Sequence, residues 1–188
     1  MEYVEPIRDR KQLENMKRYL KDKSQRDWLL FLLGINSGLR ISDLLALKVS
    51  DVKAKDRVTL REVKTGKAKD FPLADSCRKA IAEYLKANSL PDDAPLFCSR
   101  KKTKEGAYRA ISRQQAYDLV NEAAAAVGIK DNVGTHTLRK TFGYHAYKAG
   151  HDITRIQQLL NHSAPSVTLR YIGITKDELD KVYINLDL

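Results

Sequence analysis

Cysteine is scarce in this sequence: Cys77 and Cys98 are the only two in 188 residues. Two cysteines cannot build a disulfide framework, and the charged opening stretch MEYVEPIRDRKQLE contains no apolar export signal. We therefore expect two free thiols in a cytoplasmic protein. Long apolar runs are also missing, and none approaches the roughly 20 residues that a membrane-spanning helix requires. The hydrophobic fraction of 43% nevertheless suits a globular protein and not a disordered one.

Motifs for binding metals and nucleotides are missing as well. The four histidines show none of the pair spacings of a zinc site. Gly66-Lys67 lacks the preceding glycine and the following hydroxyl residue of a phosphate-binding loop, and there is no Gly-x-Ser-x-Gly elbow. No cluster of paired acids could hold metal ions for phosphoryl transfer. We expect no metal and no cofactor, so that any chemistry on phosphodiesters would use the chain's own side chains.

Acidic residues are outnumbered, since 24 Asp and Glu accompany 34 Lys and Arg, a net charge of +10. The excess is local: seven basic residues accompany two acidic ones from Lys53 to Lys69, and six accompany one from Arg100 to Arg113. Clustered positive charge predicts a polyanionic partner, and nucleic acid is favoured. A lysine-rich surface that only aids solubility is the alternative. A membrane surface is disfavoured because neither segment is amphipathic.

Apolar periodicity predicts a mainly α fold with one small antiparallel sheet, of the α+β class, in a single domain over residues 1–188. The stretches Val58–Val63 and Ala68–Leu73 predict a hairpin, to which Val49–Val52 would add a third strand. Ser112, Thr135 and Asp152 are expected as N-caps. Helices are expected over Arg10–Lys21, Asp27–Asn36, Leu39–Lys48, Asp75–Ala87, Ser112–Gly128, Thr135–Gly150, Ile153–His162 and Ser163–Ile172, and in the acidic tail KDELDKVYINLDL.

The stretch HTLRK places His136 and Arg139 three residues apart, hence on one face of an expected helix. Arg40 stands at another expected helix start. Metal-free phosphodiester cleavage needs cations for the charge on the non-bridging oxygens, a nucleophile, and an acid for the leaving alkoxide. Arginine suits the first task because its fork binds phosphate and stays charged. Taken singly, such residues are more often surface arginines, helix caps or structural histidines.

Four segments in order strengthen the functional interpretation. They are GLRISDLLALKVSDV, VKTGKAKDFPL, HTLRKTFGYHAYKAG and IQQLLNHSAPSVTLRYI. In wording, order and spacing they closely resemble the motifs of the tyrosine recombinase (phage integrase) family, and they cover the chain from about Trp28 to Tyr171. The resemblance implies the catalytic-domain fold of that family and a site-specific DNA recombinase of the integrase or invertase type.

The resemblance also implies a role for each matching residue. Arg40 and Arg139 would contact the scissile phosphate, with Asp43 supporting Arg40. Lys64 would be the general acid toward the leaving 5′-oxygen, although Lys67 on the same short turn is a rival. His136 would handle a proton or orient its neighbours, and His162 would donate a hydrogen bond to a non-bridging oxygen. Tyr171 would be the nucleophile, chosen among nine tyrosines by its position.

The family chemistry would form a 3′-phosphotyrosine and free a 5′-hydroxyl, after which a 5′-hydroxyl of another strand restores the backbone without ATP or a metal.

The expected partners are double-stranded DNA and further copies of the chain. It would form a homotetramer on DNA and a monomer or weak oligomer when free, and the tail would dock on a neighbouring subunit or on its own domain. The expected location is the cytoplasm of a bacterium, at the nucleoid, with the gene bacterial or phage-borne. Charge and placement make Lys48, Lys67, Lys69, Arg100, Lys101, Arg109 and Arg113 candidate DNA contacts.

Three alternatives and one departure from the family pattern remain. A type IB topoisomerase-like enzyme would share the chemistry without strand exchange, and a non-catalytic DNA-binding regulator would keep only the fold. An RNA-binding protein would explain the charge but not the motifs.

About 27 residues precede the apolar helix, too few for the N-terminal DNA-clamping domain of most members. We therefore expect either a catalytic fragment or a naturally short member.

Overall fold

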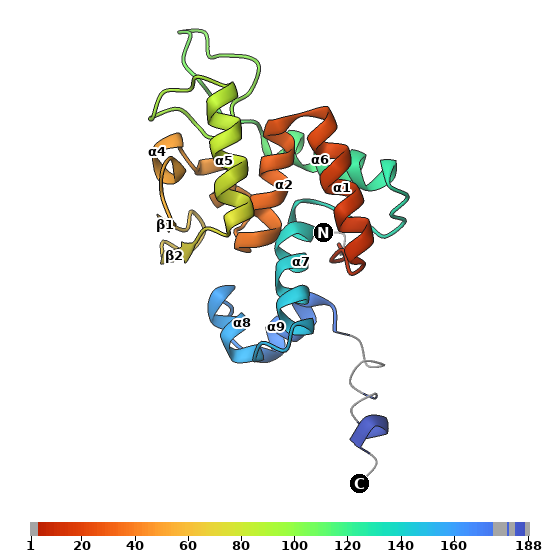
Figure 1. Ribbon diagram of the computed structural model, residues 1–188. Helices are drawn as coiled ribbons and strands as arrows, with labels where there is room; N and C mark the ends of the chain where they lie inside the picture. The colour runs from red at the N-terminus through yellow and green to blue at the C-terminus, as the bar shows by residue number, and fades with distance from the viewer. Residues whose placement is uncertain (1–3, 175–179, 181–182, 187–188) are drawn as a thin grey trace.

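The computed structural model describes residues 4–174, 180 and 183–186, and these form helices around a two-stranded antiparallel sheet (Figure 1). The mainly α fold predicted from the sequence is confirmed. None of the helices in the described residues is long and apolar enough to cross a membrane. The elements are α1 Arg10–Lys23, α2 Gln25–Ser37, α3 Ile41–Ala46, α4 Val49–Val52, β1 Arg57–Arg61, β2 Ala68–Pro72, α5 Asp75–Ala87, α6 Arg113–Ala126, α7 Thr135–Lys148, α8 Ile153–Leu159 and α9 Pro165–Ile172.

The central helix is α2, as its apolar sequence predicted. Every residue from Leu29 to Gly34 is buried, and α2 packs against α1, α5 and α7. Ser24 starts the helix, since its hydroxyl accepts a hydrogen bond from the backbone N–H of Asp27. The predicted N-caps Ser112 and Asp152 are also confirmed. α7, by contrast, is capped by Gly134 and not by Thr135, which is its first helical residue.

The hairpin pairs Arg57 with Pro72 and Arg61 with Ala68. Its side chains alternate, so that Val58 and Phe71 face the core. The third strand predicted over Val49–Val52 is wrong, because this segment is the short helix α4. Val49 and Val52 are both buried and stand three residues apart, a spacing that puts them on one face of a helix but on opposite faces of a strand. The Asp51 carboxylate accepts the Lys48 N–H and closes the first turn.

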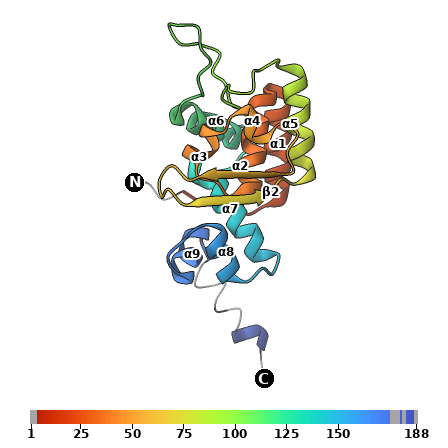
Figure 2. The ribbon, with the colours of Figure 1, turned by 90° about the vertical axis from the view of Figure 1, so that its left-hand side faces the viewer.

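Helix α7 joins two hydrophobic cores. The large core lies among α1 to α6 and the hairpin and includes Leu138 from the first half of α7. The small core consists of Tyr144 from the second half of α7 with Ile156, Leu160 and Ile172. In Figure 1, α7 runs out of the main body toward α8 and α9, which lie together at one end of the molecule. Figure 2 shows the hairpin on the side of the body that borders α8 and α9.

Two glycines allow α7 to pack closely on both sides. A Cβ at Gly34 of α2 would lie 2.6 Å from Leu138 Cδ1, in the large core. A Cβ at Gly143 of α7 would lie 2.6 Å from Ile172 Cγ2, in the small core. Both distances are too short for a real carbon contact, so each glycine is required by close approach of its neighbour. Of the predicted tail helix, Asp180 and residues 183–186 are helical, and the remainder lies outside the described residues.

Candidate active site

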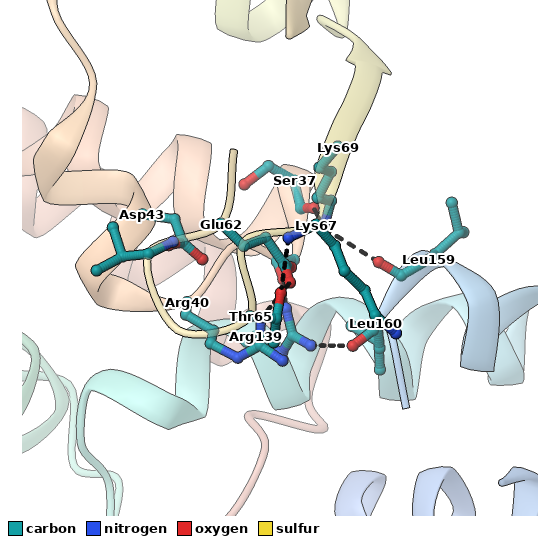
Figure 3. Close-up of polar contacts among 12 residues, drawn as sticks. Ser37, Arg40, Asp43, Glu62, Thr65, Lys67, Lys69, Arg139, Leu159 and Leu160 are labelled. Carbon is teal, nitrogen blue, oxygen red and sulfur yellow. Dashed lines mark hydrogen bonds and ion pairs between the residues drawn. The ribbon is translucent and has the colours of Figure 1, made fainter. Parts of the chain in front are cut away.

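Arg40 precedes α3 and pairs with a carboxylate that the sequence analysis did not single out. Its Nη1 lies 2.7 Å from Glu62 Oε2, and 16% of the Arg40 side chain remains exposed (Figure 3). Burial would raise the pKa of Glu62, but hydrogen bonds from Thr65, Arg40 and Asn161 outweigh it and lower this pKa to about 2. Glu62 is therefore ionised at neutral pH, and it holds the guanidinium while leaving part of its fork accessible.

Asp43, predicted to support Arg40, contacts the hairpin. Its Oδ1 accepts the backbone N–H of Val63 at 2.7 Å, and the residue is 2% exposed. In the described part of the chain, the ion pair of Arg40 is formed with Glu62. Asp43 fixes the turn between β1 and β2, which carries Lys64, against the first turn of α3.

Arg139 is buried at the point where α7 passes from one core to the other, and it is 2% exposed. Its Nη1 donates to the Gly38 carbonyl at 2.6 Å, and its Nη2 donates to the Leu160 carbonyl (Figure 3). Burial lowers the pKa of the guanidinium from its very high ordinary value. A guanidinium has five N–H donors, so three remain after these two bonds. Arg139 therefore connects the end of α2 to the end of α8 and can still bind an anion.

Lys69 is a second buried cation. Its Nζ donates to the Leu159 carbonyl at 3.0 Å and lies 3.4 Å from the Ser37 carbonyl. Burial, followed by the charge of Arg139, lowers the pKa of Lys69 to about 8. Lys69, a candidate DNA contact by charge and placement, is thus only 8% exposed. The alternation of β2 explains this burial, because Lys69 shares the inward face with Phe71.

The two histidines and the tyrosine predicted from the four segments converge. Tyr171 Oη lies 3.5 Å from His136 Nδ1, and the rings of Tyr171 and His162 meet edge to face with centroids 4.8 Å apart. Burial and the neighbouring cations, Arg139 first, lower the pKa of His136. Burial, then Arg139 and Arg40, lower the pKa of His162 to about 4. Both imidazoles are therefore neutral at pH 7.

Two further residues that the sequence analysis missed border Tyr171 and His162. The Lys140 ammonium lies 5.2 Å from the centre of the Tyr171 ring, and Lys140 is 4% exposed. The hydroxyl of Thr168, which is buried in α9, lies 3.1 Å from His162 Nδ1. A cavity of about 630 Å³ opens beside His136, Lys140 and Tyr171, so Tyr171 can be reached from outside.

The buried charges of this site do not balance. Around Glu62, Arg40, Arg139 and Lys69 contribute three positive charges, and the carboxylates of Asp43 and Glu62 contribute two negative ones; Lys140 adds a further positive charge beside Tyr171. Buried charge is costly unless it is compensated, so the arrangement favours a further anion. A DNA phosphodiester carries one negative charge. The described residues contain no group of three or more His, Cys, Asp or Glu that could hold a metal ion.

The remaining predicted DNA contacts lie on the surface. Lys64 and Lys67 are exposed on the hairpin turn. Lys48 and Arg113 are also exposed, and Arg100, Lys101 and Arg109 are exposed on the loop at the opposite end of the molecule from α8 and α9 (Figure 1). Among the described residues, the site therefore collects Arg40, Asp43, His136, Arg139, His162 and Tyr171, with Lys64 on the adjacent turn.

Comparison with known proteins agrees with this geometry. Residues 8–178 match the phage integrase family model. The chain is 46% identical over 183 residues to the probable integrase/recombinase YoeC of Bacillus subtilis, and the match covers 97% of each protein. It is 29% identical over 167 residues to the tyrosine recombinase XerC of Thermodesulfovibrio yellowstonii, covering 85% of this chain but 54% of that protein.

The fold resembles that of solved recombinases. The crystal structure of XerH bound to its difH substrate after cleavage superimposes with a TM-score of 0.77 at 20% identity, covering 100% of this chain and 55% of that one. The chain thus spans nearly all of YoeC and about half the length of XerC and XerH. Both the sequence match and the fold lead to one conclusion: this chain belongs to the phage integrase family, the tyrosine recombinases.

Proposed function

We propose that this chain is a site-specific DNA recombinase that cleaves and rejoins DNA strands through a 3′-phosphotyrosine at Tyr171. The observation that carries the proposal is the convergence of Tyr171, His136 and His162 on the buried Arg139 and the half-buried Arg40, in surroundings with more positive than negative charge. The relatives named as tyrosine recombinases break and rejoin DNA, and the XerH structure holds its DNA substrate.

The first step is attack of Tyr171 Oη on the phosphorus of the scissile phosphodiester. His136 is neutral and within reach, so it accepts the phenolic proton as the bond forms. Arg40 and Arg139 stabilise the charge that develops on the non-bridging oxygens. Lys64 donates a proton to the 5′-oxygen as its bond to phosphorus breaks. The products are the 3′-phosphotyrosine and a free 5′-hydroxyl.

His162 contributes a hydrogen bond to a non-bridging oxygen, and Thr168 sets the tautomer that makes this possible. When the Thr168 hydroxyl donates to Nδ1, a neutral His162 carries its proton on Nε2. Nε2–H can then donate to the phosphate. The same hydroxyl lies 3.4 Å from the Ala164 carbonyl, a longer contact that it gives up in this arrangement.

The second step reverses the first with a different strand. A 5′-hydroxyl attacks the phosphotyrosine and gives its proton to Lys64, which the first step left neutral; Tyr171 leaves, and the proton held at His136 returns to it. The phosphotyrosine conserves the energy of the phosphodiester, so the reaction requires neither ATP nor a metal. Exchange between two duplexes requires several active sites at once, and we propose that the chain assembles as a homotetramer on DNA, where exposed residues such as Lys48, Arg100 and Arg113 contact the backbone.

Covalent trapping in the source cell tests the proposal. Wild type and Tyr171→Phe would be expressed, the cells lysed in SDS with a chelator, and the DNA bound to protein sequenced. We expect a wild-type adduct at one recurring sequence and none with the variant. An adduct in both would mean that another tyrosine is the nucleophile, and an adduct in neither would favour a DNA-binding protein without catalysis. Reciprocal exchange between two plasmids carrying the recovered sequence separates a recombinase from a relaxing enzyme of the type IB class.

A further inference from the structure

Glu62 is a buried carboxylate for which the proposed reaction has no task. It stands at the end of β1, its side chain is 0% exposed, and it directly pairs with Arg40 (Figure 3). Burying a carboxylate costs several kcal/mol unless it is well paired and hydrogen-bonded. The chain places this charge inside its most positive region, so the contacts of Glu62 reveal what it holds together.

Three separate parts of the site meet at this carboxylate. Arg40 comes from the start of α3, at 2.7 Å from Oε2. Thr65, on the hairpin turn, donates its hydroxyl to Oε2 at 2.6 Å. The nearby Asn161, from the segment that follows α8, helps to lower the pKa of this carboxylate.

The backbone of Glu62 also shapes the turn that carries Lys64. Its N–H donates to the Lys67 carbonyl at 2.9 Å, and its carbonyl accepts the Gly66 N–H at 2.8 Å. Lys64 lies between these anchors, two residues from Glu62. Any shift of the Glu62 side chain relative to Arg40 is therefore passed to the turn, and with it to the position of Lys64.

Asn161 extends the connection to the small core. It directly precedes His162 and has a φ of 50°, in the left-handed region that asparagine tolerates better than most residues. The neighbouring His162 is held by its backbone N–H, which donates to the Gln157 carbonyl at 3.0 Å. The proximity of Asn161 to Glu62 thus brings the segment that carries His162 close to the partner of Arg40.

We propose that Glu62 is a positioning residue of the recombinase, whose carboxylate holds Arg40, the Lys64 turn and the Asn161–His162 segment in one arrangement. This inference rests on the proposed function, because these are the residues that would act on the phosphate. Glu62 acts through Arg40, Lys64 and His162 and does not itself contact the DNA.

The test compares Glu62→Gln with a matched control, Asp70→Asn. Both variants remove one negative charge from the hairpin, but Asp70 is 47% exposed and pairs with Arg57 on the surface. Hydrogen exchange is measured first, without DNA. We expect faster exchange in residues 62–67 and 159–163 of Glu62→Gln, with α1 and α5 unchanged and Asp70→Asn like the wild type. Unchanged exchange in Glu62→Gln would overturn the proposal.

The second readout separates binding from chemistry. The probe is a nicked duplex of the sequence recovered by trapping, on which DNA affinity and the rate of adduct formation at saturating DNA are measured. We expect Glu62→Gln to lower the rate roughly tenfold to a hundredfold, because a displaced catalytic group loses its alignment. Since it removes negative charge near the phosphate, it should bind DNA at least as tightly as the wild type. Equal effects of Glu62→Gln and Asp70→Asn would overturn the proposal.

A third variant keeps the test decisive if Glu62→Gln does not fold. Asn161→Gly removes the side chain that lies near Glu62 but tolerates the same positive φ. We expect it to lower the rate by roughly threefold to tenfold and to speed exchange in residues 159–163; a wild-type rate and exchange would overturn the proposal. Failure of the proposed function looks different, because the wild type itself would then form no adduct while the exchange measurements still report on Glu62.

Discussion

The large and small cores contribute different parts of the site. The large core carries Arg40, Lys64 and His136, together with the buried charges around them, whereas α9 on the small core carries Tyr171. The large core includes residues from seven helices and the hairpin, and the small core consists of Tyr144, Ile156, Leu160 and Ile172. Arg40 and Lys64 therefore rest on the more extensive apolar core, and Tyr171, the proposed nucleophile, rests on the smaller one.

Polar contacts hold the two regions in register. Arg139 and Lys69 donate to the carbonyls of Leu160 and Leu159, and the next residue, Asn161, lies near Glu62. All of these contacts reach the same short segment at the end of α8. The small core is therefore held to the large one by hydrogen bonds from charged groups, in addition to the apolar packing of α7. Four sets of variants test this division, in order of decreasing expected effect.

Arg139→Ala should have the largest effect. It removes a phosphate-binding cation and, at the same time, both carbonyl bonds that connect α2 to α8. We expect adduct formation to fall at least about a thousandfold, at the upper end of the loss seen when one oxyanion-stabilising donor is removed. Arg139→Lys keeps the charge but not the two-armed contact and serves as the control. Adduct formation by Arg139→Ala within tenfold of wild type would refute the role assigned to Arg139.

Lys64→Ala should lower the rate by roughly a hundredfold to ten-thousandfold, the usual contribution of a general acid. Replacing the 5′-bridging oxygen of the scissile phosphate by sulfur should restore most of the rate, because a thiolate, of pKa about 8.5, leaves without protonation. Lys67→Ala is the matched control and should retain nearly full activity on both substrates. The opposite pattern, with sulfur rescuing Lys67→Ala, would assign the acid to Lys67.

Gly143→Ala and Gly34→Ala place the same extra methyl group in the small and the large core. Each should destabilise its core by about 1–3 kcal/mol, the usual cost of overpacking. Because α9 lies against Gly143, we expect Gly143→Ala to speed hydrogen exchange in α8 and α9 and to slow adduct formation, with α2 unchanged. Gly34→Ala should lower the midpoint of global unfolding. If both variants behave alike, the two cores form one cooperative unit and the comparison fails.

Acid should weaken the small core through His162. Its pKa is lowered to about 4 in the folded protein, against about 6.5 in the unfolded chain, so between these pH values the unfolded state binds the extra proton. Stability must therefore fall as the pH is lowered from about 6.5 toward 4. His162→Gln removes this titration. Urea unfolding at pH 7 and pH 4.5 should show a smaller loss of stability in the variant, and an equal loss would mean that His162 is not the group responsible.

Much of the fold and most of the site could be predicted from the sequence. The helix Asp75–Ala87 was predicted with its observed bounds, because its apolar spacing and its ends are local features. The family motifs identified Arg40, His136, Arg139, His162 and Tyr171, which the structure brings together. Their catalytic roles remain predictions.

The residues that were missed depend on long-range contacts. Nothing near Glu62 in the sequence indicates a partner at Arg40, 22 positions away, or at Asn161, since only the fold brings these together. The burial of Lys69 could have been predicted, because strand alternation puts it on the same face as Phe71. Charge and placement made Lys69 a candidate DNA contact, and strand alternation was not considered. The segment Val49–Val52 is too short for periodicity to distinguish a helix turn from a strand.

The central claim is that Tyr171, presented by the small core, attacks a phosphate held by the large one. Peptide mapping of the trapped adduct tests it most directly: the wild-type adduct is digested with nuclease and protease, and the tyrosine that retains the nucleotide is located by mass spectrometry. The account predicts a 3′-linked nucleotide on the peptide containing Tyr171 and on no other. A nucleotide on another tyrosine, such as Tyr144 or Tyr147 of α7, would contradict it.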